Sequence, residues 1–249
     1  MLNALTIAGF DPSGGAGVLA DARTFAAFGY RPSAVITSIT FQNDKAGRGA
    51  MHQTAAIVRD QISTLLDEFS YACVKVGMLP TREVIRQVAG LFQQDDVPSA
   101  IVDPVMITSS GLRLMQEDAL EMFISEMLPV ARLVTPNIPE AAALSGVTIS
   151  NEAQMEQAAR IIRRLGARAV LIKGGHLKDP GEAIDFLDDA GQVTVFRAPF
   201  LPGVRLRGSG CILSSGIAAG LGKGNTLEDS VRQAKEFVLA QLREAAQNQ

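Results

Sequence analysis

The sequence predicts an α/β fold, a three-layer α/β/α sandwich whose mostly parallel central sheet carries helices on both faces. Short runs rich in Val and Ile alternate with amphipathic segments of helical period along nearly the whole chain. A hydrophobic fraction of 47% beside 20% charged residues is typical of a globular protein with a sizeable core. No Pro/Gly/Ser-rich linker or internal repeat divides the chain, so residues 1–249 are predicted to form one domain.

Six apolar runs are short enough to be buried strands of a parallel sheet. They are residues 4–8, 34–39, 72–76, 100–102, 133–135 and 169–173. Two more runs, 183–187 and 193–197, flank a turn-like DDAG segment, which predicts an antiparallel hairpin near the sheet edge.

Helices are predicted between these strands and at the end of the chain. They cover residues 18–28, 54–69, 82–94, 117–127, 151–165, 210–222 and 227–246. In segment 151–165, Met155, Ala158 and Ile162 share one face, as expected of a helix that packs on a sheet. Because sheets of this kind bind ligands beyond the carboxyl ends of their strands, the loops that follow the strands are the places to seek chemistry.

The loop after the first strand, residues 9–17 (GFDPSGGAG), is rich in glycine and leads into a helix that carries Asp21. Glycine lets backbone amides approach a ligand, and the helix start favours an anion or polar group. A tight turn that needs positive φ explains the same glycines equally well. The loop matches neither the dinucleotide pattern nor the Walker A pattern.

Polar or flexible side chains also follow the second and third strands. Gln42 offers both a donor and an acceptor to a heteroaromatic ring, and Met78 has a side chain suited to pack on its face. For Met78, simple core filling is the interpretation that spacing alone favours.

The next three strands end in residues suited to phosphate and metal chemistry. Asp103 follows the fourth strand, Asn137 and Glu140 follow the fifth, and Lys173 ends the sixth beside two glycines. Carboxylates with substrate phosphates suit Mg²⁺, and a lysine beside flexible backbone suits a phosphate. Asn137 before Ile138 and a proline is equally a candidate helix N-cap.

The segment Arg207-Gly208-Ser209-Gly210-Cys211 opens an apolar helix. Successive amides at a helix start form an anion hole, with Arg207 beside it. Here the helix dipole and nearby cations are expected to lower the pKa of Cys211, so that it acts as a base. The alternative is an inert buried cysteine, which suits Cys73 better.

Taken in order, these pieces resemble the hydroxymethylpyrimidine/phosphomethylpyrimidine kinases of thiamine biosynthesis, within the ribokinase-like superfamily. The matching stretches span nearly the whole chain. They are Leu5–Thr24, Val35–Asn43, Lys75–Leu79, Val102–Met106, Thr135–Ala141, Leu171–Leu177 and Gly208–Cys211.

The resemblance implies a ribokinase-like fold and transfer of the ATP γ-phosphoryl group to the hydroxymethyl of 4-amino-5-hydroxymethyl-2-methylpyrimidine. Whether the phosphomethyl form is also a substrate stays open, because Arg207, Ser209 and Ile212 depart from the family's usual His-Gly-Thr-Gly-Cys-Thr. Carried over, the residues that line the pyrimidine pocket are Gly9, Asp21, Gln42, Met78 and Val105. Those on the nucleotide side are Lys173 and Asn137, with Asp103 and Glu140 at the Mg²⁺. Arg207, which departs from the family, is also placed on the nucleotide side, by its charge beside the anion hole. The catalytic residues are Cys211 as base and Gly208, Ser209 and Gly210 as anion hole.

Two other functions fit the same residues. A pyridoxal or pyridoxamine kinase is a close alternative, because one change at a ring contact shifts selectivity. A pyrimidine-binding regulatory protein without catalysis is the other, motivated by the altered segment around Arg207. The resemblance also implies a homodimer.

Composition narrows the partners and the compartment. A formal net charge of −3 argues against nucleic acid, which needs clustered Lys and Arg. No apolar run is long enough to span a bilayer, and the first residues lack a signal-peptide pattern. Two cysteines are too few for a disulfide scaffold and suit a reducing compartment, so we expect a cytoplasmic protein.

Overall fold

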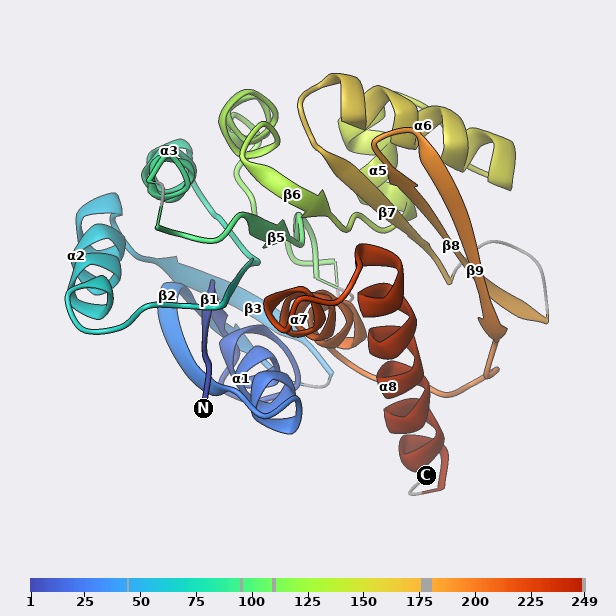
Figure 1. The fold of residues 1–249 in the computed structure, drawn as a ribbon, viewed down its shortest axis with the longest axis horizontal. Coiled ribbons are helices and arrows are strands. Elements are labelled where there is room, and N and C mark those ends of the chain that lie inside the picture. The colour runs from blue at the N-terminus through green and yellow to red at the C-terminus, as the bar shows by residue number, and fades with distance from the viewer. Residues whose placement is uncertain (44, 95, 109–110, 176–180, 248–249) are drawn as a thin grey trace.

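The computed structural model is built on one mixed sheet of nine strands, in the order β3-β2-β1-β4-β5-β6-β7-β8-β9 (Figure 1). It describes residues 1–43, 45–94, 96–108, 111–175 and 181–247. The strands are β1 (Asn3–Phe10), β2 (Arg31–Gln42), β3 (Gly47–His52), β4 (Cys73–Val76), β5 (Ala100–Val102), β6 (Ala131–Val134), β7 (Ala169–Gly174), β8 (Glu182–Asp189) and β9 (Gln192–Pro199). Neighbouring strands are parallel along the sheet from β2 through β1, β4, β5 and β6 to β7. β3 pairs antiparallel with β2, and β8 pairs antiparallel with both β7 and β9. The predicted α/β class with a mostly parallel sheet is confirmed.

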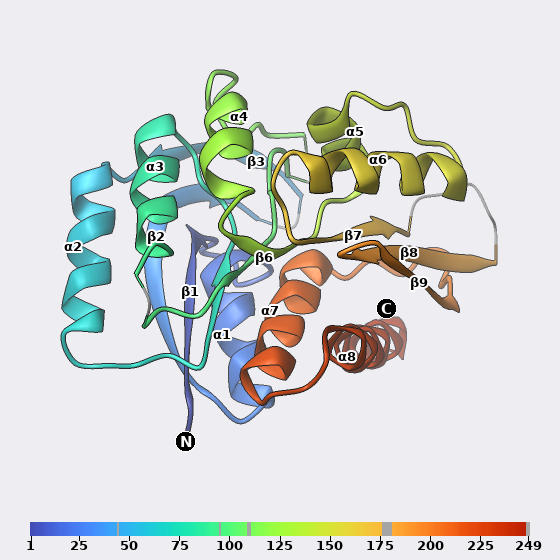
Figure 2. The ribbon, with the colours of Figure 1, turned by 45° about the horizontal axis from the view of Figure 1, so that its top comes forward.

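Helices cover both faces of the sheet, which gives three layers (Figure 2). On one face lie α1 (Gly17–Ala27), α7 (Ser209–Gly222) and α8 (Leu227–Gln247). On the other lie α2 (Ala55–Leu66), α3 (Arg82–Leu91), α4 (Ala119–Met122) with the π-helical turn η1 (Phe123–Met127), α5 (Ile138–Ser145) and α6 (Glu152–Arg164).

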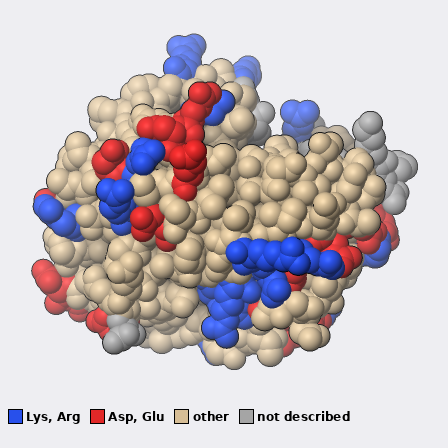
Figure 3. Space-filling model, turned by 90° about the horizontal axis from the view of Figure 1, so that it is seen from above, with Lys and Arg blue, Asp and Glu red and all other residues tan. Residues whose placement is uncertain are grey.

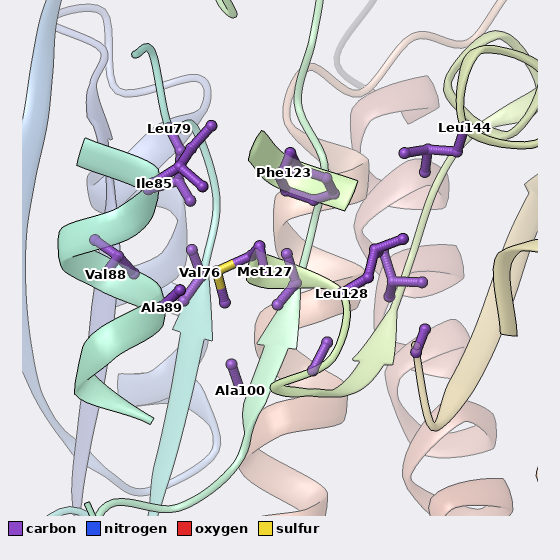
Figure 4. Close-up of a cluster of buried hydrophobic side chains, with 14 of the residues drawn as sticks. Val76, Leu79, Ile85, Val88, Ala89, Ala100, Phe123, Met127, Leu128 and Leu144 are labelled. Atoms are coloured by element: carbon purple, nitrogen blue, oxygen red, sulfur yellow. The ribbon is translucent and has the colours of Figure 1, made fainter. Parts of the chain in front are cut away.

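Each face of the sheet has its own apolar core, because successive side chains of a strand point to opposite faces. In β5, Ala100 and Val102 belong to the core under α3 and η1, whereas Ile101 belongs to the core under α7. Figure 4 shows the first of these cores, where the Met127 side chain points toward Val76. Burying each large side chain of this kind contributes roughly 1.5–3 kcal/mol, so the two cores fix the strand ends that carry the site.

Two elements were not predicted from the sequence, and a third differs from its prediction. β3 contains two glycines and few apolar residues, so its period does not stand out. α5 is short and follows Asn137, which the sequence identified only as a candidate cap. The helix predicted over 117–127 is four residues of α-helix followed by a five-residue π-helical turn.

The surface carries both signs of charge. On the face that Figure 3 shows, basic and acidic side chains lie in small groups separated by uncharged surface. Among the described residues, no helix combines the length and the hydropathy that crossing a bilayer requires.

Candidate active site

The glycine-rich loop between β1 and α1 is organised by the carboxylate of Asp11, which is 1% exposed. Its Oδ1 accepts hydrogen bonds from the backbone N–H and the hydroxyl of Ser13 at 3.0 and 2.8 Å, and its Oδ2 accepts one from the Ala16 N–H at 3.0 Å. Gly17 closes the loop with φ 61°, and a Cβ there would lie 2.1 Å from the Gly9 carbonyl oxygen. A side chain at position 17 would therefore break the loop.

Four of the residues predicted to hold a ring lie at or just beyond the ends of β1, β2, β4 and β5. A Cβ on Gly9 would lie 2.8 Å from the sulfur of Met78, so the missing side chain lets Met78 pack against β1. Met78 is 4% exposed, and its carbonyl accepts a 2.6 Å hydrogen bond from the Thr37 hydroxyl. Gln42, at the end of β2, and Val105, after β5, are half-buried. These four predicted residues each follow or end a strand, with Met78 oriented mainly by packing.

Asp21 does not line that pocket as predicted, because its side chain has no exposed surface. Its carboxylate accepts hydrogen bonds from the Thr6 hydroxyl at 2.6 Å, the Ser215 hydroxyl at 2.9 Å and the Lys75 ammonium at 2.8 and 3.0 Å. Lys75 is likewise fully buried. Burial lowers the pKa of Lys75, but the charge and hydrogen bond of Asp21, together with the charges of Cys211 and Asp103, outweigh that effect and raise the pKa above its ordinary value. The buried pair joins α1, β4 and α7 beneath the loops.

A second ion pair lies at the ends of β5 and β7. The Lys173 ammonium is 2.7 Å from Asp103 Oδ1, which also accepts a 3.2 Å hydrogen bond from the Thr135 hydroxyl. Burial lowers the pKa of Lys173, but the carboxylates of Asp103 and Glu140 outweigh it and raise the pKa above its ordinary value. Lys173 therefore stays a cation.

Asn137 and Glu140 form a capping box at the start of α5. The Asn137 side chain accepts the Glu140 N–H at 2.9 Å, and Glu140 Oε2 accepts the Asn137 N–H at 2.8 Å. The cap interpretation of Asn137 is thus confirmed. Burial raises the pKa of Glu140 to about 7, opposed by Lys173 and supported by Asp103. Glu140 therefore belongs electrostatically to the Asp103–Lys173 pair as well as to the cap.

Two carboxylates with few other donors suit Mg²⁺, which binds through one or two carboxylates plus waters and substrate phosphates. Asp103 and Glu140 are 2% and 6% exposed. Among the described residues, no group of three or more His, Cys, Asp or Glu side chains is arranged to hold a metal ion. The donor set fits a magnesium ion whose coordination is completed by a nucleotide.

The start of α7 packs directly on the glycine-rich loop. Gly208 has φ 72°, and a Cβ on it would lie 2.3 Å from the Gly15 carbonyl oxygen. A Cβ on Gly210 would lie 3.0 Å from the Lys173 ammonium and 3.6 Å from Asp103 Oδ2. The first turn of α7 thus lies between the loop and the Asp103–Lys173 pair.

One amide of the predicted anion hole already has a partner within the protein. The Ser209 N–H already donates to the Leu206 carbonyl at 3.3 Å. Gly210 and Cys211 belong to the first helical turn, whose N–H groups find no partner within the helix. Their amides, with Lys173 nearby, are the donors suited to an incoming phosphate.

The prediction that the pKa of Cys211 is lowered is wrong. Burial raises the pKa of its thiol to about 11, and the negative charges of Asp21 and Asp103 add to that effect. The Lys75 ammonium and a hydrogen bond from the Gly17 N–H act in the opposite direction without outweighing burial. A helix start favours a thiolate, but keeping that charge away from water costs more free energy than the helix start supplies.

Arg207, predicted on the nucleotide side, lies against the glycine-rich loop. Its guanidinium is 2.9 Å from Asp11 Oδ2 and donates to the Ser13 hydroxyl at 2.7 Å. The sequence did not identify this partnership or the role of Lys75. Asp11 and Lys75 lie within the quoted family stretches, but nothing local to them reveals a partner far along the chain. His176 and Leu177, at the end of another such stretch, fall outside the described residues.

The chain is similar to known phosphomethylpyrimidine kinases over nearly its whole length. A family model described as phosphomethylpyrimidine kinase matches residues 11–249. The hydroxymethylpyrimidine/phosphomethylpyrimidine kinase of Streptomyces coelicolor is 41% identical over 234 residues, covering 94% of this chain and 86% of that protein.

Solved structures resemble the chain over almost its full length. The phosphomethylpyrimidine kinase of Clostridium difficile has a TM-score of 0.85 and 35% identity, covering 97% of this chain and all of the other. The pyridoxal kinase of Staphylococcus aureus in complex with pyridoxal has a TM-score of 0.89 and 29% identity, covering 98% and 88%. The predicted ribokinase-like fold of these kinases is confirmed.

Proposed function

The chain belongs to the phosphomethylpyrimidine kinase family, and we propose that it transfers the γ-phosphoryl group of ATP to the hydroxymethyl of 4-amino-5-hydroxymethyl-2-methylpyrimidine. The sequence relatives named for this activity, at about 40% identity, support this step of thiamine biosynthesis. The phosphomethyl product is a candidate second acceptor, since the relatives' names join both activities.

One observation carries the proposal. The first turn of α7, with Gly210 and Cys211, lies between the glycine-rich loop and the Asp103–Lys173 pair, whose ion-pair distance is 2.7 Å. An acceptor on the loop side and a phosphate chain on the lysine side would meet at Cys211. Phosphoryl transfer needs this kind of positioning and charge stabilisation more than covalent help.

In the proposed reaction, Gly9, Met78, Gln42 and Val105 hold the ring so that its hydroxymethyl faces Cys211. Because the pKa of the Cys211 thiol is raised to about 11, the thiolate is the minor form at neutral pH. That form accepts the hydroxyl proton as the oxygen attacks the γ-phosphorus, and the bond to the ADP oxygen breaks. The Lys173 ammonium and the Gly210 amide stabilise charge on the transferring group. The Lys75 ammonium favours the thiolate. Asp21 contributes by holding Lys75 in place.

Mg²⁺ belongs to the proposal as well, with Asp103 and Glu140 as its protein ligands and Asn137 holding Glu140 through the capping box. When bound, the ion would neutralise phosphate charge. ATP as co-substrate is supported by the related pyridoxal kinase solved with an ATP analogue.

Three further features are proposed from the family. Residues 1–249 form one kinase domain, supported by one continuous nine-stranded sheet. The protein is a homodimer, which light scattering after gel filtration tests. It works in a reducing cytoplasm, in keeping with Cys73 and Cys211 as free thiols.

The test is a coupled assay of ADP formation with ATP and Mg²⁺, run in turn with the hydroxymethyl pyrimidine, its phosphate and pyridoxal. We expect turnover that depends on the hydroxymethyl pyrimidine. Faster turnover of pyridoxal would favour the pyridoxal kinase alternative, to which the Staphylococcus aureus structure gives some weight. Pyrimidine binding by calorimetry without any ADP formation would instead indicate a regulatory binding protein.

A further inference from the structure

Arg207 and the glycine-rich loop meet in a contact that neither the family match nor the proposed chemistry uses. The guanidinium reaches Asp11 and Ser13, which lie 194 or more residues earlier in the chain. The Asp11 carboxylate is 1% exposed, and the Arg207 side chain is 21% exposed. An ion pair so shielded from water is worth more than an exposed one.

Other atoms of the loop also pack closely around the Arg207–Asp11 ion pair. A Cβ on Gly15 would lie 3.2 Å from both Cδ and Nη1 of Arg207, and a Cβ on Gly208 would meet the Gly15 carbonyl at 2.3 Å. The loop therefore rests on the Arg207 side chain and on the backbone just before α7. Asp11 joins the Arg207 charge to the loop backbone through the Ser13 and Ala16 N–H groups.

The far end of the same loop leads into α1, which packs against the helix that carries the proposed base. Gly17 is the first residue of α1, and Cys211 lies in the first turn of α7. Gly17 itself is fixed by the loop, with φ 61° and the Gly9 carbonyl against it. A displacement of the loop at Asp11 would thus be transmitted both to Cys211 and to the Gly9 side of the ring pocket.

We propose that Arg207 is a positioning residue for the phosphoryl transfer: by holding Asp11 and Ser13 it fastens the glycine-rich loop to the start of α7, which keeps the loop in place beside the helical turn that carries Cys211. The inference rests on the proposed function for its kinetic consequence, although the contact itself does not. Arg207 acts through the loop and needs no contact with substrate or nucleotide.

The test compares Arg207→Met with Arg207→Lys and with Arg205→Met as a matched control, since Arg205 is exposed and lies in the same approach to α7. Arg207→Met keeps much of the stem that packs on Gly15 but removes the charge. We expect its kcat with the hydroxymethyl pyrimidine to fall about tenfold or more, because small displacements of reacting groups cost large factors. The KM for ATP should stay within about twofold, and Arg207→Lys should recover part of kcat, since one ammonium can still reach Asp11.

A second readout does not need catalysis. Iodoacetamide labelling of Cys211, followed by peptide mass spectrometry, should be faster in Arg207→Met than in wild type, because the loop no longer shields the sulfur. Cys73, which is 4% exposed, should stay unlabelled in both and so shows that the fold persists.

The outcomes separate the inference from the proposed function. Wild-type protein without kinase activity would refute the proposed function, while faster labelling of Cys211 in Arg207→Met would still support the loop contact. Labelling of Cys211 within twofold of wild type, or slower, would overturn the inference. So would an unchanged kcat in an active enzyme, or a loss in Arg205→Met equal to that in Arg207→Met.

Discussion

The buried pair of Lys75 and Asp21 allows a stability prediction with a worked magnitude. In Lys75→Met, the Asp21 carboxylate loses an ammonium at 2.8 and 3.0 Å and stays in a place with no exposed surface. Breaking such a pair typically costs about 3–5 kcal/mol. Because the hydroxyls of Thr6 and Ser215 still donate to this carboxylate, we expect the lower end, about 3 kcal/mol.

For a chain of this size, that loss corresponds to a melting temperature lower by about 6–12 °C. Urea denaturation measures the free energy of unfolding directly, with the midpoint lower and the slope unchanged. The double variant Asp21→Asn with Lys75→Met buries no unpaired charge, so it should be more stable than Lys75→Met alone. A single variant within about 1 kcal/mol of wild type, or a double variant that is no more stable than the single one, would refute the reasoning.

Three more predictions concern the loops around the site. Burial raises the pKa of Glu140 from 4.5 to about 7, so the folded state binds this proton more tightly than the unfolded state does. The free energy of unfolding of wild type, relative to Glu140→Gln, should therefore fall as pH rises from 4.5 to about 7. A difference in urea unfolding that does not change with pH would contradict this. Gly208→Ala should lower kcat and stability, because its Cβ would lie 2.3 Å from the Gly15 carbonyl oxygen. Gly203 has a similar φ of 79° but no atom within 4 Å of such a Cβ, so Gly203→Ala should cost only backbone strain. Equal losses of the two variants in thermal melts and assays would rule out the contact. Asp103→Asn should raise the Mg²⁺ concentration for half-maximal activity at least about tenfold, and an unchanged magnesium titration would remove Asp103 from the metal site.

The sequence predicted the layers and the site region because both depend on local patterns. Apolar runs identified every strand of the sheet except β3, whose two glycines and Arg48 hide its period. Residues after the strands were placed correctly at the carboxyl edge because chain direction and sheet type determine where those ends meet.

What the sequence could not predict are the partners of the charged residues. Asp21 was assigned to the pocket by the family resemblance, whereas Lys75 and Ser215, whose side chains bind its carboxylate, lie on other elements. The predicted direction of the pKa shift of Cys211 was wrong for a similar reason. Helix starts are visible in a sequence, but the burial that raises this pKa depends on how the loop packs on α7.

The most direct test of the account is ADP formation with the hydroxymethyl pyrimidine by wild-type protein and by Cys211→Ala, with Cys73→Ala as the control at the other cysteine. If Cys211 is the base, kcat should be lower by about 10²–10⁴ in Cys211→Ala, while the melting temperature and pyrimidine binding are retained. Nearly wild-type turnover is expected in any Cys73→Ala protein that remains folded. Turnover in Cys211→Ala equal to that of wild type would contradict the account, because no base would then be needed at the start of α7.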